Sequence, residues 1–70
     1  MSKWQGIEVV FQNTPKNKEL LKDNKGKKAL YSDTVISIRF YYCYEFYYEF
    51  YQECLNILKT NNIPYIEVSF

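Results

Sequence analysis

The pattern of apolar and polar residues changes its period in the middle of the chain, within Thr34–Lys59. Residues 34–42 alternate, which is typical of a strand, whereas apolar residues at 44–60 recur every three or four positions, which is typical of an amphipathic helix. Neither glycine nor proline interrupts 44–60, and the pair Asn61-Asn62 before a proline is a stop signal. The apolar stripe of the predicted helix is Tyr47, Phe50, Tyr51, Cys54, Leu55 and Leu58.

The alternation in residues 34–42 predicts a strand with two different faces. The face expected to pack against the helix is apolar and consists of Ile36, Ile38, Phe40 and Tyr42. The other face is mixed and consists of Val35, Ser37, Arg39 and Tyr41. β-Branched and aromatic residues, which suit a packed pleated surface, fill this segment.

Two further strands are predicted near the ends of the chain. Residues 7–12 alternate, with one side formed by Ile7, Val9 and Phe11. Residues 63–70 alternate as well, with one face formed by Ile66, Val68 and Phe70 and the other by Tyr65, Glu67 and Ser69. A proline at the start of this last strand is compatible with a first or edge position.

The segment between the first strand and the central one is less regular. Thr14 is a plausible N-cap and Pro15 suits the first helical position, so residues 16–22 are either a two-turn helix or an irregular connector. Residues 23–28 contain glycine and charged residues and predict a solvated turn. Residues 29–31 are then a short strand or a bridging segment.

These elements predict one small domain over residues 1–70, of the α/β class with α+β as the alternative. The expected order is β-(α)-β-α-β, with a three-stranded sheet and one long amphipathic helix on one face. Because a helix joins strands 34–42 and 65–70, we expect them to be parallel and linked by a right-handed crossover. The free face would carry Val10, Val35, Tyr41 and Tyr65 among polar residues. Either a second copy or another partner covers that face, or residues 13–31 fold over it.

Composition adds a surplus of aromatic rings to this picture. Aromatic residues make up 20% of the chain and eight of them are tyrosines. A core of this size cannot enclose so many rings, so we expect several at the surface or at an interface. The abundance of Asn, Lys, Ile and Tyr, whose codons are A/T-rich, indicates an AT-rich genome such as that of a phage, a plasmid or a low-GC bacterium.

The cysteines and the ends of the chain predict a cellular location. Cys43 and Cys54 are too far apart for a disulfide if both lie on the helix. Two free thiols are typical of a reducing compartment. The N-terminal residues lack the apolar region of a signal peptide, and the longest apolar run is too short to span a membrane. We therefore expect a cytoplasmic protein with no membrane contact.

Residues suited to catalysis are scarce. The chain has no histidine, no glycine-rich phosphate loop and no cluster of metal ligands, so we expect no enzyme, no cofactor and no metal site. Glu45, Glu49 and Glu53, each four residues apart, form one ridge of the helix. This ridge is either a solvated face or an acidic contact surface for a basic partner. Cys43 has acidic neighbours, which disfavour a reactive thiolate.

Charge is unevenly distributed although the net charge is only +1. Residues 16–28 carry +4 and the rest of the chain carries −3. Lysines without arginine suit non-specific contact with a phosphate backbone better than base readout. The candidate nucleic-acid-binding residues are Lys22, Lys25, Lys27 and Lys28, and a solvated loop is the alternative interpretation.

The sequence therefore favours a small non-enzymatic protein-binding module that acts by surface contact. An inhibitor or adaptor encoded by a phage or mobile element fits its size and composition, and we expect a homodimer or a host protein as partner. The candidate protein-binding residues are Tyr41, Tyr44, Glu45, Tyr48, Glu49 and Glu53. The alternative is a nucleic-acid-binding accessory protein that uses the lysine-rich segment 16–28.

Overall fold

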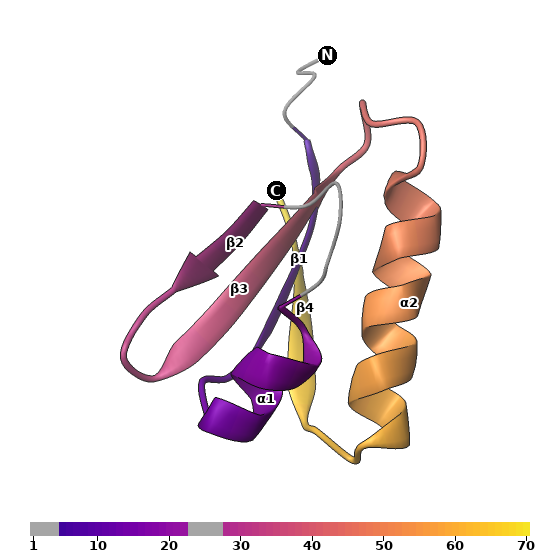
Figure 1. Ribbon diagram of the computed structural model, residues 1–70. Coiled ribbons are helices and arrows are strands. Elements are labelled where there is room, and N and C mark those ends of the chain that lie inside the picture. The colour runs from indigo at the N-terminus through magenta and orange to yellow at the C-terminus, as the bar shows by residue number, and fades with distance from the viewer. Residues whose placement is uncertain (1–4, 23–27) are drawn as a thin grey trace.

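The computed structural model describes residues 5–22 and 28–70, so most of the predicted turn at 23–28 lies outside the described residues. This part of the chain forms four strands and two helices, which are labelled in Figure 1. In order they are β1 (Gly6–Gln12), α1 (Pro15–Leu20), β2 (Lys28–Tyr31), β3 (Val35–Tyr41), α2 (Tyr47–Thr60) and β4 (Tyr65–Ser69). The sequence predicted a sheet of three strands, whereas the structure has four. The additional strand is β2, in the segment 29–31 that the sequence left as either a short strand or a bridging segment.

The strands form one sheet in the order β2-β3-β1-β4, and every neighbouring pair is antiparallel. β3 and β4 run in the same direction, but β1 lies between them, so they do not form the parallel pair that a simple crossover predicts. Likewise β3 lies between β1 and β2. Two interleaved β-α-β units of this kind form the split arrangement known as ferredoxin-like. The sheet is antiparallel, which makes the class α+β, the alternative within the prediction.

One face of the sheet packs against α2, and the predicted apolar stripe of this helix is confirmed. Four residues of α2 are buried: Tyr51, Cys54, Leu55 and Leu58. They share one core with the inward-facing residues of the central strands, namely Val9, Phe11, Ile36, Ile38 and Phe40. The predicted inner faces of β1 and β3 are therefore confirmed up to Phe40.

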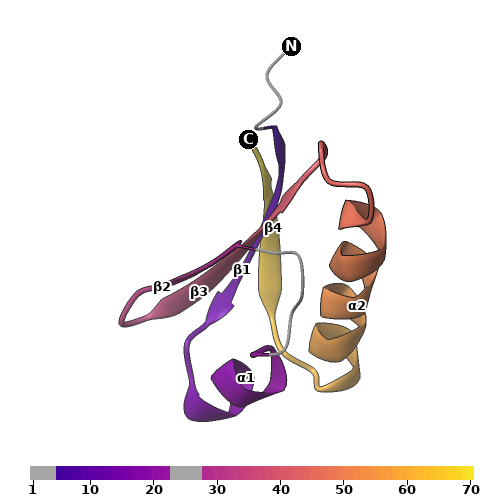
Figure 2. The ribbon, with the colours of Figure 1, turned by 45° about the horizontal axis from the view of Figure 1, so that its top comes forward.

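The segment around α1 packs on the same side of the sheet as α2. Thr14 is the N-cap, since its side-chain oxygen accepts a hydrogen bond of 3.1 Å from the backbone N–H of Asn17. Asn17 is buried and its amide donates a 2.9 Å bond to the carbonyl of Gln12. Leu21 lies in the core with the residues of α2. The described residues of segment 13–31 thus form part of the core and extend the sheet, and they leave its other face open (Figure 2).

The connection between β3 and α2 is longer than the sequence pattern predicts. β3 ends at Tyr41, and the backbone N–H of Tyr44 closes a turn onto the Tyr41 carbonyl at 3.1 Å. Tyr42 therefore lies in the turn and is exposed, which corrects its predicted place on the core face. Cys43 in the same turn is exposed and Cys54 is buried, and neither forms a disulfide.

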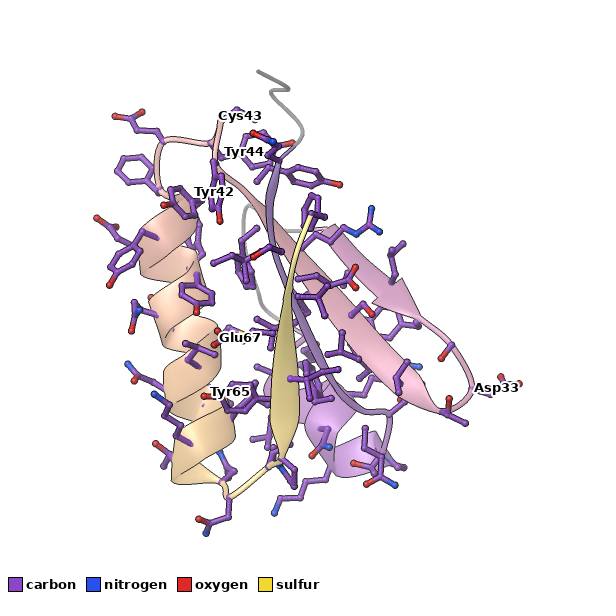
Figure 3. All side chains as sticks on the ribbon, turned by 180° about the vertical axis from the view of Figure 1, so that it is seen from behind. Asp33, Tyr42, Cys43, Tyr44, Tyr65 and Glu67 are labelled. Atoms are coloured by element: carbon purple, nitrogen blue, oxygen red, sulfur yellow. The ribbon has the colours of Figure 1, made fainter. Side chains whose placement is uncertain are left out.

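The faces of β4 are the reverse of those the sequence pattern favoured. β4 pairs with β1 so that Glu67 lies opposite the core residue Val9 and Tyr65 lies opposite Phe11. The face directed toward α2 therefore carries Tyr65 and Glu67, as Figure 3 shows, and Tyr65 does not belong to the free face. After α2, Asn62 adopts a left-handed φ of 56° and Ile63 is buried, which fixes the register in which β4 starts. The face turned outward carries Ile66, Val68 and Phe70.

Candidate functional site

The face of the sheet opposite the helices, here called the open face, carries a band of exposed apolar side chains. Odd and even residues of a strand point to opposite faces, so the pairing fixes which residues lie on it. Its apolar members with more than a third of their surface exposed are Leu30 (42%), Val35 (37%), Ile66 (62%), Val68 (43%) and Phe70 (37%). Exposed apolar side chains gathered on one face in this way are typical of an interaction site.

One end of the open face is hollowed. The hollow has a volume of about 340 Å³ and lies where the start of β3 and the start of β4 flank β1. Its lining is mostly apolar and comes from three separate segments: Val10, Phe11, Gln12, Thr34, Val35, Pro64, Tyr65 and Ile66. Phe11 and Tyr65 border the hollow although their side chains belong to the opposite face of the sheet. This volume is at the lower end of the range for ligand pockets and can hold one large side chain of a partner.

The centre of the open face holds one ion pair. The Arg39 Nε donates to a carboxylate oxygen of Glu8 at 2.7 Å, across the neighbouring strands β3 and β1. Hydrogen bonds to Glu8 and then Tyr41 raise the pKa of Arg39, so the guanidinium stays charged throughout the ordinary pH range. The guanidinium also lies 5.0 Å from the centre of the Phe70 ring. These two charges are therefore paired within the molecule.

The other end of the open face is aromatic. The ring of Tyr41 makes edge-to-face contacts with Phe70, at 5.4 Å between centroids, and with Tyr44, at 5.7 Å. Tyr41 is almost buried by these contacts, whereas Tyr44 is exposed. Two of the predicted protein-binding residues, Tyr41 and Tyr44, are thus brought together next to Phe70, which follows β4 and was not among the predicted site residues.

The remaining predicted protein-binding residues lie on a different surface. Tyr48, Glu49 and Glu53 are exposed on α2, and Glu45 is exposed in the turn before it. The ring contacts of Tyr48 are with its neighbours on α2, Tyr47 and Tyr51. The predicted site is therefore divided between one end of the open face and the outer side of the helix.

Four tyrosines are exposed in the described part of the chain, as the aromatic surplus predicts: Tyr31, Tyr42, Tyr44 and Tyr48. Two of them, Tyr42 and Tyr48, contact Tyr47 at 5.1 Å and 6.2 Å between ring centroids. The prediction that a core of this size leaves rings at the surface is confirmed.

The candidate nucleic-acid-binding lysines give no common surface in the described residues. The ammonium group of Lys22 lies 2.6 Å from a carboxylate oxygen of Glu19. Lys25 and Lys27 lie outside the described residues, and Lys28 is described only by its backbone in β2. The nucleic-acid hypothesis stays a prediction.

The residues that sequence reasoning missed are the outward side chains of β4 and Leu30 of β2. The sequence pattern correctly placed Ile66, Val68 and Phe70 on one face. A face of three apolar residues is normally expected to be buried, so these residues were not considered as a binding surface. One signal pointed the other way: Ile63, two residues before the strand, is an apolar residue that fills the core in their place. In the part of the chain that the structure describes, no group of His, Cys, Asp or Glu residues has a geometry that would hold a metal ion.

Tyr51 and Glu67 form a polar contact between α2 and β4. The Tyr51 hydroxyl donates a 2.9 Å hydrogen bond to a Glu67 carboxylate oxygen. Burial, together with this bond, raises the pKa of Tyr51 from 10.0 to about 12. The neutral phenol is thus preferred in the folded state, and its stabilising effect is present below pH 10 and is lost as the pH rises toward 12.

We expect this pH dependence to disappear in Tyr51→Phe. Between pH ~9 and ~11 the wild-type free energy of unfolding should fall by about 1 kcal/mol more than that of the variant. Urea denaturation of both proteins at each pH measures the difference, and comparing the two proteins cancels the titration of the other tyrosines and the lysines. Equal losses would show that the Tyr51 hydroxyl titrates with its ordinary pKa.

Neither helix in residues 5–22 and 28–70 has the length and apolar character needed to cross a membrane. Comparison of the chain with protein-family models, with curated proteins and with solved structures gave no match, so its function has to be argued from its own geometry.

Proposed function

We propose that this chain is a small, non-enzymatic protein-binding module and that it binds its partner with the open face of its sheet. The observation that carries the proposal is the outward-facing apolar row of β4 beside the hollow, on a face that no described helix covers. A sheet normally buries such a face against another layer. The proposal identifies that missing layer as a partner protein.

The open face has the features of an interface core. Apolar side chains flank the ion pair of Glu8 and Arg39, so docking leaves neither of these two charges unpaired beneath the partner. The hollow offers a place for a single anchoring side chain, and such anchors contribute most of the binding energy in many interfaces. The exposed ring of Tyr44 borders the opposite end and adds area with a hydroxyl at low conformational cost.

The biological setting belongs to the same proposal. Neither Cys43 nor Cys54 forms a disulfide, which favours a reducing compartment and hence the cytoplasm. The abundance of Asn, Lys, Ile and Tyr, whose codons are A/T-rich, favours a phage or other mobile element as the source, where a chain of this size would serve as an inhibitor or adaptor of a host protein. The acidic ridge of α2 is free to make a second, weaker contact with a basic region of that partner.

A paired charge substitution tests which surface binds. The wild-type chain, an open-face variant (Ile66→Asp) and a ridge variant (Glu49→Lys with Glu53→Lys) are immobilised and used to capture proteins from the source cells, with and without nuclease. We expect one stoichiometric protein partner that survives nuclease and the ridge changes, and whose affinity for purified Ile66→Asp falls at least about tenfold. Titration calorimetry with the purified partner gives that ratio.

The other outcomes each point to a different surface or partner. A partner that Ile66→Asp retains and the ridge variant loses would assign the contact to α2 and overturn the open-face proposal. A partner released by nuclease would favour the nucleic-acid hypothesis. Because Ile66 is 62% exposed, its replacement by aspartate should leave the fold intact, and circular dichroism of the free variant checks this.

A further inference from the structure

We propose that the chain forms a two-fold symmetric dimer in which β4 of one copy pairs antiparallel with β4 of a second copy. This inference goes beyond the binding of a different protein on the open face and stands independently of it. β4 is the last strand in the sheet order, so one of its sides has no neighbouring strand among residues 5–22 and 28–70. All of its residues after Tyr65 are exposed.

The pairing of β4 with β1 shows which backbone groups point to its unpaired side. Gly6 and Phe70 exchange two hydrogen bonds of 3.0 Å each. Hydrogen-bonded pairs alternate along an antiparallel ladder, so Val68 and Ile66 also direct their backbone groups toward β1. The residues whose N–H and C=O groups point to the unpaired side are therefore Tyr65, Glu67 and Ser69.

β4 lacks several of the features that usually protect an edge strand. Such strands carry lysines, an internal proline or a bulge, which discourage pairing with another chain. β4 has none of these between Tyr65 and Ser69, and its pairing with β1 is continuous. Its only charged residue is Glu67, whose carboxylate is hydrogen-bonded to Tyr51 and directed toward α2 (Figure 3). The edge is therefore a ready template for another strand.

The sequence of β4 indicates that a second copy is the strand that fits. Residues 66–70 read Ile-Glu-Val-Ser-Phe, a pattern of apolar and polar residues that is symmetric about Val68. With the two-fold axis at Val68, Ile66 of one copy lies opposite Phe70 of the other. Glu67 lies opposite Ser69, and their outward backbone groups exchange hydrogen bonds.

Charge also favours this register. An axis at Glu67 would place the two Glu67 carboxylates directly opposite each other, which is destabilising. The net charge of +1 means that two copies repel each other only weakly. In the proposed dimer the apolar rows of the two open faces become one continuous surface, so dimerisation doubles the area offered to a partner.

Single cysteines test the register directly. At the axis the two Val68 residues form a non-hydrogen-bonded pair with Cα atoms ~4.5 Å apart, within disulfide range. In a Cys43→Ser background, which removes the exposed thiol, we expect Val68→Cys to form a disulfide-linked dimer under mild oxidant. Ile66→Cys is the matched control, because it is more exposed on the same face but lies opposite Phe70. It should cross-link at least about tenfold more slowly, a difference that non-reducing electrophoresis resolves.

Removing one edge donor tests the pairing without changing the open face. The N–H of Ser69 points to the unpaired side, so Ser69→Pro removes it while leaving the hydrogen bonds to β1 in place. Analytical ultracentrifugation should show dimers for the wild type and for the control Ser69→Ala. Ser69→Pro should weaken the dimer at least about tenfold and retain the circular dichroism of the folded chain.

The results distinguish this inference from the proposed function. A wild-type chain that is monomeric up to millimolar concentration overturns the dimer, whether or not it captures a partner. Preferential cross-linking of Ile66→Cys, or assemblies larger than a dimer through the other edge at β2, overturns it as well. A dimer that captures no partner instead overturns the proposed function alone.

Discussion

Replacing Leu58 with alanine is expected to lower the free energy of unfolding by about 3–4 kcal/mol. Leu58 has no exposed surface and lies in the core with Val9, Phe11 and Ile36. Its truncation removes apolar contacts and leaves a cavity that the rigid sheet beneath cannot close. Since a domain of this size has a total stability of only roughly 5 kcal/mol, the variant should retain only about 1–2 kcal/mol and unfold at a much lower urea concentration than the wild type.

The matched control for Leu58→Ala is Asn56→Ala, an exposed position in the same helix. Both changes introduce alanine, the best helix former. A loss of stability in Leu58→Ala but not in Asn56→Ala therefore cannot be due to helix propensity. Urea denaturation followed by circular dichroism should place the control within about 0.5 kcal/mol of the wild type. A loss below about 1 kcal/mol in Leu58→Ala would mean that α2 does not pack on the sheet through its apolar stripe.

The periodicity of the sequence was sufficient to predict the local elements and most of their inner faces. The stripe from Tyr47 to Leu58 and the alternation from Ile36 to Phe40 are local patterns, and each is confirmed. Thr14 was recognised as a helix cap by residue type alone and is confirmed by its bond to Asn17. These features depend on residues close together in the sequence, where the physical rules for helices and strands apply directly.

The strand order depends on contacts that no local pattern contains. β1 pairs with both β3 and β4, yet an alternating strand looks the same in a sequence whether it is central or at an edge. The preference for pairing strands joined by a single helix therefore predicted the wrong neighbours. The direction of β3 relative to β4 was nevertheless right, because inserting an antiparallel strand between them preserves it.

The faces of β4 show how a functional surface is missed by sequence reasoning. A period of two defines two faces but not which one is buried, and a shift by one residue exchanges them. Assigning the apolar face of β4 to the core is the natural choice, and it hides Ile66 and Val68 from any search for exposed residues. Tyr41 and Tyr44 were found because tyrosine is common at interfaces, whereas the hollow was missed because three distant segments form it.

Replacing Gly6 with alanine is expected to cause the second large loss in the free energy of unfolding. Gly6 lies opposite Tyr41 of β3 and exchanges two hydrogen bonds with Phe70. A Cβ atom at this position would overlap the backbone carbonyl oxygen of Phe40. A backbone atom cannot move aside by a side-chain rotation, so β1 and β3 would have to separate locally. We expect a loss of about 2–3 kcal/mol in the free energy of unfolding.

Gln12→Ala, an exposed change at the opposite end of β1, is the control and should stay within about 0.5 kcal/mol of the wild type. Thermal unfolding compares the two variants, and near-ultraviolet circular dichroism reports on the rings. Because the Tyr41 and Phe70 rings make contact at the same end of the sheet as Gly6, the aromatic signal should weaken in Gly6→Ala and not in Gln12→Ala. An unchanged melting temperature in Gly6→Ala would mean that β1 and β3 are not in close contact there. In that case the contact between the Tyr41 and Phe70 rings would also be wrong, and the open face would have no aromatic end.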